Sequence, residues 1–218
     1  MSLGTVAILG GTGQQGSGLA RRFAAAGLDV VVGSRDPQRA QSTVDAWRPS
    51  VRVEVAGNAE AAASAATVLL AVPYATVDAL LDEIAPRLQP GAVAIDLIVP
   101  LTFAGGTMAM LDVAEGSAAE HIRAKLPPTV ALACAFKTIP AHLVDRVEEP
   151  LDCDEFICGD SDAARGRAAD LVTHIAGLRA VDVGPLARAR SIEQLTALAI
   201  AINRRHKRHD ARFRIVGL

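Results

Sequence analysis

Aromatic residues, cysteines and long hydrophobic runs are all scarce in this sequence. Phe, Trp and Tyr together make up 3% of the 218 residues, so a surface that stacks nucleic-acid bases is not expected. The three cysteines, Cys134, Cys153 and Cys158, lack C-x-x-C spacing, and we expect reduced residues in core strands rather than a disulfide or a metal site. The apolar stretch at 195–202 is far too short to span a bilayer.

The charge of the chain is nearly balanced. Its 22 basic and 24 acidic side chains leave a formal net charge of −2, which provides no general attraction to nucleic acid or to anionic membranes. The N-terminal sequence MSLGTVAILGG has no basic segment before its apolar residues, so a signal peptide is not expected. The five histidines show no metal-binding spacing. We therefore expect a cytoplasmic protein that binds small molecules and no metal, nucleic acid or membrane.

Short β-branched runs alternate with alanine-rich segments along most of the chain. Strands are predicted at 6–9, 29–32, 51–55, 67–72, 93–96, 130–133, 155–158 and 179–183. The first six runs are almost continuously apolar, which is typical of parallel strands covered on both faces, and the pattern is looser after about residue 150. The alternation predicts an α/β fold with a Rossmann-type doubly wound, mostly parallel sheet in one domain over 1–218, where 185–218 form a C-terminal helix and tail.

Several residues mark the ends of the predicted helices. The segment 77–84 has apolar residues at i, i+3, i+4 and i+7, the spacing of one helix face. Gly27 is typical of a helix C-terminus, and Ser117 with a glutamate three residues later is typical of an N-terminus. We also expect Asp162 to cap a helix and a last helix to begin near Ser191.

A G-x-G-x-x-G motif follows the first predicted strand. It consists of Gly11, Thr12, Gly13, Gln14, Gln15 and Gly16 and lies where the strand turns into a helix, as a dinucleotide-binding loop requires. We expect Gly11 to make the tight turn, Gly13 to let the backbone approach a pyrophosphate, and Gly16 to let the helix pack closely on the strand. Free N–H groups at the helix start would bind the phosphates. The alternative is a glycine turn that binds nothing.

The second predicted strand leads into Ser34 and Arg35 rather than into a carboxylate. A carboxylate there would bond the adenosine ribose 2′-hydroxyl and repel a 2′-phosphate, whereas a hydroxyl and a guanidinium both donate to phosphate oxygens. Thr12 and Arg39 could join them, and Asp36 is expected to face solvent. The domain should therefore bind NADP(H) in preference to NAD(H). The alternative is that Arg35 is an ordinary surface arginine.

The fourth predicted strand ends in Val72, Pro73 and Tyr74. Its carboxyl end borders the crevice where a dinucleotide runs toward the middle of such a sheet. We expect these three residues to contact the ribose or the nicotinamide. Pro73 is equally compatible with a plain helix start.

Six short motifs together resemble one enzyme family. They are GGTGQQG, VVGSR, AVP, KTIPAHL, ICGD and VGPL, spread over residues 10–186. In this order they are similar to the F420:NADP oxidoreductases, which are NADPH-dependent reductases of the deazaflavin coenzyme F420. A more distant resemblance is to the cytosolic domains of membrane ferric reductases, which use ordinary flavin.

The resemblance implies an NADPH-dependent oxidoreductase that transfers hydride between NADP(H) and a deazaflavin or flavin. The acceptor would lie in a cleft between the sheet and the C-terminal segment, where direct hydride transfer needs little acid–base help. The family segment that matches residues 137–140 borders both rings, which places Ile139 at the cofactor. Its first position is commonly histidine and here is Lys137, which could pair with an acceptor oxygen or face solvent.

The C-terminal part of the chain leaves alternatives open. The sequence NRRHKRHDARFR at 203–214 is rich in Arg and Lys; these cations complement a helix dipole or hold the phosphate and carboxylates of an anionic cofactor tail. The apolar face of the last helix either packs on the sheet or forms a homodimer contact, which is usual in the resembling family.

Two other functions are compatible with these residues. An NADPH-dependent imine or keto reductase would need a proton donor near the nicotinamide, for which Lys137 is the one candidate. A non-catalytic redox sensor would bind NADPH tightly without oxidising it.

Overall fold

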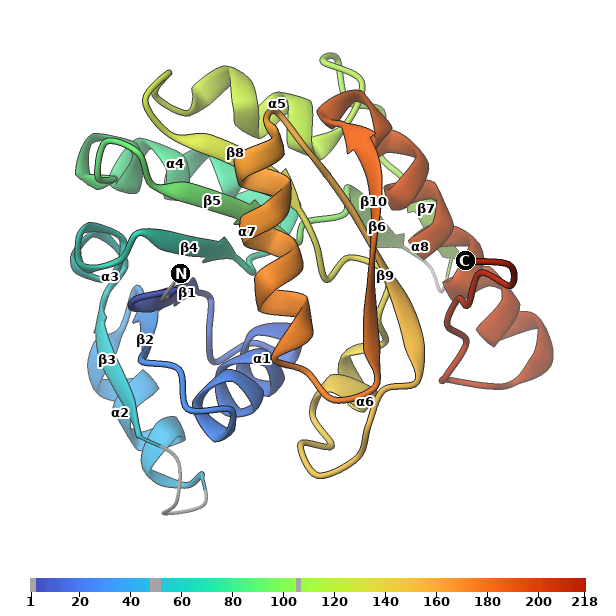
Figure 1. Cartoon of the computed structure of the whole chain (residues 1–218), viewed down its shortest axis with the longest axis horizontal. Helices are drawn as coiled ribbons and strands as arrows, with labels where there is room; N and C mark the ends of the chain where they lie inside the picture. Colours follow the sequence, from blue (N-terminus) through green and yellow to red (C-terminus); the bar gives the residue numbers. More distant parts are fainter. Residues whose placement is uncertain (1–2, 48–51, 105–106) are drawn as a thin grey trace.

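A twisted eight-stranded sheet forms the centre of the computed structural model, which describes residues 3–47, 52–104 and 107–218 (Figure 1). The strand order is β10-β9-β8-β5-β4-β1-β2-β3, and all neighbours are parallel except β8 and β9. The strand β1 lies between β2 and β4, and the strand order reverses at this point, as in a doubly wound fold. The strands are β1 Val6–Leu9, β2 Val30–Ser34, β3 Val53–Gly57, β4 Thr67–Leu70, β5 Val93–Asp96, β8 Ala131–Cys134, β9 Cys153–Gly159 and β10 Leu178–Pro185.

Helices cover both faces of this sheet. On one face lie α1 Gln14–Ala25, α6 Ala141–Val144 and α7 Asp162–Thr173. On the other lie α3 Asn58–Ser64, α4 Val77–Ile84, α5 Ala118–Lys125 and α8 Ala189–His206. The helix α2 Pro37–Asp45 packs on β2 and β3, and three short 3₁₀ turns complete the fold, at Tyr74–Thr76, Ala85–Arg87 and Leu186–Arg188.

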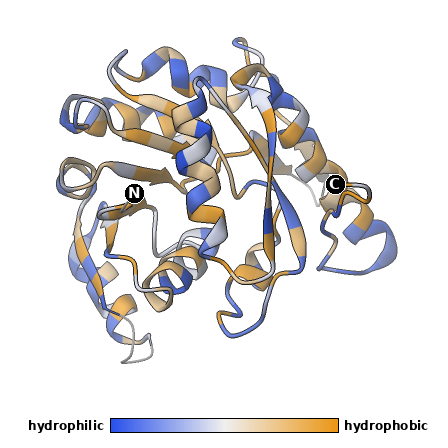
Figure 2. Cartoon of the chain, in the orientation of Figure 1, coloured by the Kyte–Doolittle hydropathy of each residue, from blue (hydrophilic) through white to orange (hydrophobic). Residues whose placement is uncertain are grey.

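Burial on both sides explains the continuous apolar strands. Along β1, Val6 and Ile8 enter one core and Ala7 and Leu9 enter the other, because successive side chains of a strand point to opposite faces. Figure 2 shows hydrophobic residues concentrated in the strands and hydrophilic ones on the outer helix faces and around the end of α8. The Rossmann-type architecture predicted from the sequence is confirmed.

The strands predicted at 6–9 and 93–96 match β1 and β5 at both ends, and the other strand ends differ from the prediction by at most two residues. The strand β2 continues to Ser34 because it pairs with β3 as far as Gly57. The strand β4 stops at Leu70, where its pairing with both neighbours ends. Residue 51, the predicted start of the third strand, lies outside the described residues. A separate hairpin of β6 Leu101–Ala104 and β7 Thr107–Met110 was not predicted.

Most of the predicted helix ends are confirmed. Gly27 has a φ of +85° and closes α1, and the Ser117 hydroxyl accepts from the Glu120 N–H at 3.1 Å. The cap of α7 is Ser161 rather than Asp162, since the Ser161 hydroxyl accepts from the Ala164 N–H at 3.2 Å. All three cysteines are free and buried, as expected.

The helix α8 and the tail after it lie against the antiparallel edge of the sheet (Figure 1). Ile192 and Ala199 are buried on the inner side of α8. The tail returns along β9, where Asp154 N donates to Phe213 O at 2.8 Å and the Phe156 and Phe213 rings meet edge to face at 6.3 Å. Among the described helices, none has both the length and the apolar character that crossing a membrane requires.

Candidate functional site

Glycines shape the loop between β1 and α1, with one change from the expected roles. The tight turn is made by Gly10, whose φ is +80° and whose added Cβ would lie 2.5 Å from Ala71 O. At Gly11 there is no room for a side chain, because an added Cβ would lie 2.8 Å from a Val32 methyl. A Cβ on Gly16 would lie 2.5 Å from Gly10 O, so close packing of α1 on the loop requires glycine there, as predicted.

The N-terminus of α1 is open to an anion. Gly13 is its N-cap, and neither a side-chain cap nor an acidic residue occupies the first turn. The free N–H groups and the helix dipole therefore favour phosphate at this end. Gln14 and Gln15 both line the adjoining cleft, and the Gln15 amide also donates to Phe136 O at 3.0 Å and so anchors the helix.

Three of the expected 2′-phosphate ligands lie around one cavity of about 360 Å³. Thr12, Ser34 and Arg35 line it together with the segment that follows β4. The Arg35 guanidinium is exposed and makes no hydrogen bond or ion pair with any described residue. Its donors are thus available to a ligand, whereas Arg39 is exposed but does not line the cavity.

Asp36 does not take the place of a ribose-binding carboxylate. It is the N-cap of α2, and its Oδ1 accepts from the Arg39 N–H at 3.0 Å. The Ser34 hydroxyl bridges back to the Asp36 backbone at 3.1 Å. Asp36 is therefore exposed, as predicted, and held by the helix start.

Asn58 belongs to the same cavity and was not predicted. It is buried at the first turn of α3, and its Oδ1 has no partner among the described residues. The sequence did contain a signal for Asn58, because this polar residue directly follows the parallel strand β3. The carboxyl ends of neighbouring parallel strands meet at one edge of the sheet, where ligands bind.

A second cavity of about 550 Å³ continues from the first along the sheet edge. Ala71, Val72 and Pro73 line both, and Tyr74 and Ile139 line the second, where they were expected. Its far wall is the inner side of α8, in line with the expected cleft between the sheet and the C-terminal segment. The residues of α8 that form this wall were not predicted: Thr196, Ala199, Ile200 and Asn203. Phe103 of the unpredicted hairpin also borders it. The two cavities together form an elongated cleft across the carboxyl ends of the strands.

The backbone is strained where the cleft meets β8. Phe136 has a φ of +61°, a conformation that non-glycine residues adopt at a cost of about 1–3 kcal/mol. The ring of Phe136 packs edge to face on Phe23 at 5.8 Å, and its carbonyl accepts from Gln15. These contacts hold the turn that carries residues 137–140 along the cleft.

A larger hollow of about 810 Å³ lies elsewhere, beside Thr5, Asp29 and Trp47 at the amino ends of β1 and β2. Ligands of open α/β sheets bind at the carboxyl ends. We therefore place the site in the cleft at the glycine loop.

Comparisons with known proteins identify the family of this chain. Residues 5–100 match the family described as coenzyme F420-dependent NADP oxidoreductase. The chain is 39% identical to the F420-dependent NADP reductase of Methanothermobacter thermautotrophicus, over 98% of this chain and 95% of that protein. For the enzyme of the same name from Methanothermobacter marburgensis, identity is 38% over 98% of both.

The chain belongs to the F420-dependent NADP oxidoreductase family. A crystal structure from Arthrobacter sp. FB24, provisionally assigned as an F420-dependent NADP-reductase, is 26% identical and has a TM-score of 0.84. The match covers 97% of this chain and 98% of that one, so the family fold extends through α8 and the tail.

Lys137, the position at which this F420-dependent NADP oxidoreductase departs from the common histidine, is not solvent-facing. Its side chain is fully buried, and Nζ lies 2.6 Å from Asp96 Oδ2 and 3.1 Å from Glu193 Oε1. Burial alone would lower the pKa of Lys137, but the neighbouring acidic groups, Asp96 foremost and Glu193 among them, together outweigh burial and hold that pKa above its usual value. The ammonium is thus a buried counter-ion and is held away from the cleft.

Glu155 lies beside Lys137 and differs from it in charge state. Its Oε1 accepts from the Lys137 N–H at 3.2 Å, and the Thr138 hydroxyl bonds its Oε2 at 3.1 Å. Burial raises the pKa of Glu155 to about 8. The side chain is therefore mostly a neutral acid at pH 7, which reduces the charge beneath residues 137–140.

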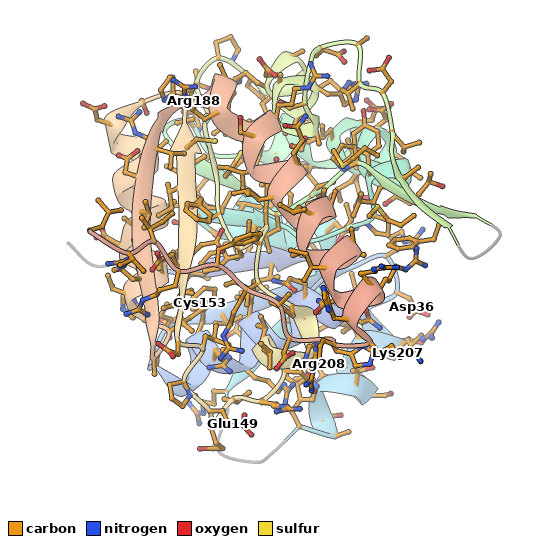
Figure 3. The ribbon with its side chains drawn as sticks, turned by 90° about the vertical axis from the view of Figure 1, so that its right-hand side faces the viewer. Asp36, Glu149, Cys153, Arg188, Lys207 and Arg208 are labelled. Atoms are coloured by element: carbon orange, nitrogen blue, oxygen red, sulfur yellow. The ribbon has the colours of Figure 1, made fainter. Side chains whose placement is uncertain are left out.

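Part of the basic tail lies next to the cleft. Lys207 and Arg208 are at the carboxyl end of α8, opposite Arg188 at its start (Figure 3). They line a hollow of about 510 Å³ with His142, Leu143, Arg146, His209 and Asp210. His209 also lines the main cleft, so the two spaces adjoin. Arg212 and Arg214 instead bond to Asp152.

Proposed function

We propose that this protein transfers hydride between NADP(H) and coenzyme F420. The observation that carries the proposal is the continuity of the two cavities: Arg35 and Ser34 line one, residues 137–140 and α8 line the other, and Val72 and Pro73 line both. An NADP(H) whose 2′-phosphate lies at Arg35 and whose pyrophosphate lies at α1 would extend its nicotinamide into the second cavity. The reductase names of the curated relatives support F420 as the other reactant.

The chain's own groups bind and orient rather than exchange protons. Thr12, Ser34 and Arg35 would hold the adenosine end, and the open N-terminus of α1 the pyrophosphate. Ile139 and the α8 side chains would press the two rings together and exclude water. Such positioning is the main requirement of a direct hydride transfer, whose chemistry the bound ring systems supply.

The position of Lys137 does not favour the alternative of an imine or keto reductase. Its candidate proton donor was Lys137, whose ammonium is fully buried between two carboxylates. The redox-sensor alternative differs from the proposal in one respect, since a sensor would bind NADPH and leave it unoxidised.

The decisive experiment follows the nicotinamide absorbance of NADPH with F420, FMN, FAD and a ferric chelate in separate reactions. We expect oxidation with F420. Activity with FMN or FAD alone would make this a flavin reductase, and no oxidation with any acceptor would favour the sensor. The variant Ile200→Trp, which adds bulk to the cleft wall, should retain NADPH binding and lose turnover, whereas Ala201→Trp on the exposed side of α8 should retain both.

We further propose that the basic hollow binds the phosphate and carboxylates of the acceptor's tail. Lys207, Arg208 and Arg146 supply the charge, and its junction with the cleft at His209 gives the tail a path. We also propose a homodimer formed through the exposed apolar residues of α8, and action in the cytoplasm, where three free cysteines would stay reduced.

A further inference from the structure

A buried ion cluster lies directly beneath one wall of the cleft. The Lys137 ammonium donates to Asp96 Oδ2 at 2.6 Å, to Glu193 Oε1 at 3.1 Å and to the carbonyl of Ile98. All three charged side chains are at most 1% exposed. The ammonium therefore has three protein acceptors for its three donors and no contact with water.

The partners of Lys137 come from different elements. Asp96 is the last residue of β5, and its Oδ1 accepts from the Ile98 N–H at 2.7 Å. Glu193 is on α8, and its Oε2 accepts from the Ala118 N–H at 3.3 Å, at the start of α5. One ammonium thus joins β5, α8 and, through Glu193, α5 to the strained segment that follows β8.

A second bond reinforces the link to α8. The Thr196 hydroxyl, one turn after Glu193, donates to Lys137 O at 3.0 Å. Thr196 also lines the cleft, as do Thr138 and Ile139 on the opposite side. The two ties from α8 to Lys137 therefore span the base of the space in which the acceptor ring would lie.

Stability alone does not account for this cluster. Apolar residues of similar volume often replace a buried ion group without loss of stability, because desolvation offsets the Coulomb attraction. An ammonium with three fixed acceptors instead fixes the relative positions of the elements that carry those acceptors, because hydrogen-bond lengths and directions are narrowly constrained.

We propose that Lys137 is a positioning residue for hydride transfer, holding α8 at a fixed separation from residues 137–140 across the acceptor half of the cleft. The inference rests on the proposed function. A displacement of about 1 Å between reacting groups slows such reactions about 100-fold. The separation of α8 from this segment should therefore affect the rate of the chemical step more than the affinity for NADPH, whose 2′-phosphate end would bind at the other cavity.

The cleanest test is Glu193→Leu. It cuts the bond from α8 to the ammonium and leaves the Lys137–Asp96 pair intact, so no lone charge remains in the interior. We expect the single-turnover rate of hydride transfer to F420 to fall about 10- to 100-fold, with the dissociation constant of NADPH within about twofold of wild type. Hydrogen exchange of α8 amides should increase without ligand. Gln194→Leu, on the exposed side of the same turn, should change none of these.

The variant Lys137→Met completes the test. If Lys137 acts through Glu193, the rate loss in the double variant Lys137→Met/Glu193→Leu should equal that of Lys137→Met alone rather than the product of the two losses. Glu193→Leu decides the question even if Lys137→Met fails to fold. An unchanged hydride-transfer rate in Glu193→Leu, or an equal loss of NADPH affinity, would overturn the positioning role. Failure of the proposed function is distinguishable, because the wild-type enzyme itself would then leave F420 unreduced.

Discussion

At the scale of single residues, we expect Arg35 to set which nucleotide the cleft prefers. Its exposed guanidinium borders the cavity at the end of β2 and is not engaged by the described part of the chain. The adjacent carboxylate, Asp36, is occupied as the cap of α2, whereas Glu83 of α4 lines the same cavity. A 2′-phosphate would meet donors from Arg35 and Thr12 there.

We expect Arg35→Ala to weaken NADPH binding and to leave NADH binding nearly unchanged. A charge-assisted hydrogen bond contributes roughly 1.5–3 kcal/mol, which corresponds to a loss of about 10- to 150-fold. Titration of both nucleotides measures the effect, and Arg188→Ala at the far end of α8 serves as the matched control. Equal weakening of NADPH and NADH would contradict the assignment.

Glu155 makes the stability of the fold depend on pH. Its folded pKa of about 8 exceeds the ordinary value of 4.5, so between these values the folded chain holds a proton that the unfolded chain has lost. The free energy of unfolding should therefore decrease as pH rises from about 4.5 to 8, by up to about 4 kcal/mol, and change little from this source above pH 8.

The variant Glu155→Gln should remove most of this slope. A Gln carbonyl can accept from the Lys137 N–H while its amide donates to the Thr138 hydroxyl, as a protonated Glu would. Urea unfolding at several pH values compares the two proteins. A slope in Glu155→Gln as steep as in wild type would assign the dependence to another group.

At the scale of elements, the two ends of α8 have different surroundings. Its first half packs on β9 and carries Glu193 and Thr196 to Lys137. Its end, capped by Lys207 with a φ of +51°, directs Lys207 and Arg208 toward the hollow beside the cleft. Arg214 lies in the same tail but is paired with Asp152.

We expect Lys207→Asn/Arg208→Gln to raise the Michaelis constant for F420 and to change kcat little. Asn tolerates the left-handed conformation at 207, so the change removes charge without straining the cap. In wild type the same constant should rise with salt, because exposed charges are screened beyond about 10 Å at 0.1 M ionic strength. Arg214→Gln is the control, and a constant that is insensitive to salt in wild type would exclude the hollow as the tail site.

At the scale of the whole molecule, exposed apolar side chains of the hairpin and of α8 lie on neighbouring elements. Phe103 on the β6–β7 hairpin is 63% exposed, and Leu198 and Ile202 on the neighbouring α8 are 50% and 39% exposed. Leu198 and Ile202 are four residues apart and share one side of the helix. An exposed apolar surface of this kind is typical of a subunit contact.

The variant Leu198→Glu/Ile202→Glu should convert the proposed dimer to a monomer, because it would bury unpaired charge at the contact. Light scattering on the column-purified protein measures the mass directly. A monomeric wild-type protein at micromolar concentration would refute the dimer.

Local patterns in the sequence determined the sheet, the glycine loop and the adenosine end of the site. Continuous apolar runs specify strands covered on both faces, and the positions of Gly16, Ser34 and Arg35 relative to those strands place them at one edge. These features depend on residues close in the chain, and so periodicity and turn chemistry reveal them. The tight turn lies at Gly10 instead of Gly11, and the cap of α7 is Ser161 instead of Asp162. Sequence patterns therefore located these two features only to within one residue.

Only the tertiary structure decided the acceptor end. Lys137 lines the cleft, as its sequence position suggested, but the carboxylates of Asp96 and Glu193 hold its side chain in the interior after the positive φ of Phe136. The α8 wall likewise depends on how the last helix folds back across the sheet. No local pattern carries this information, because the free energy of such contacts comes from segments brought together by the topology of the whole chain.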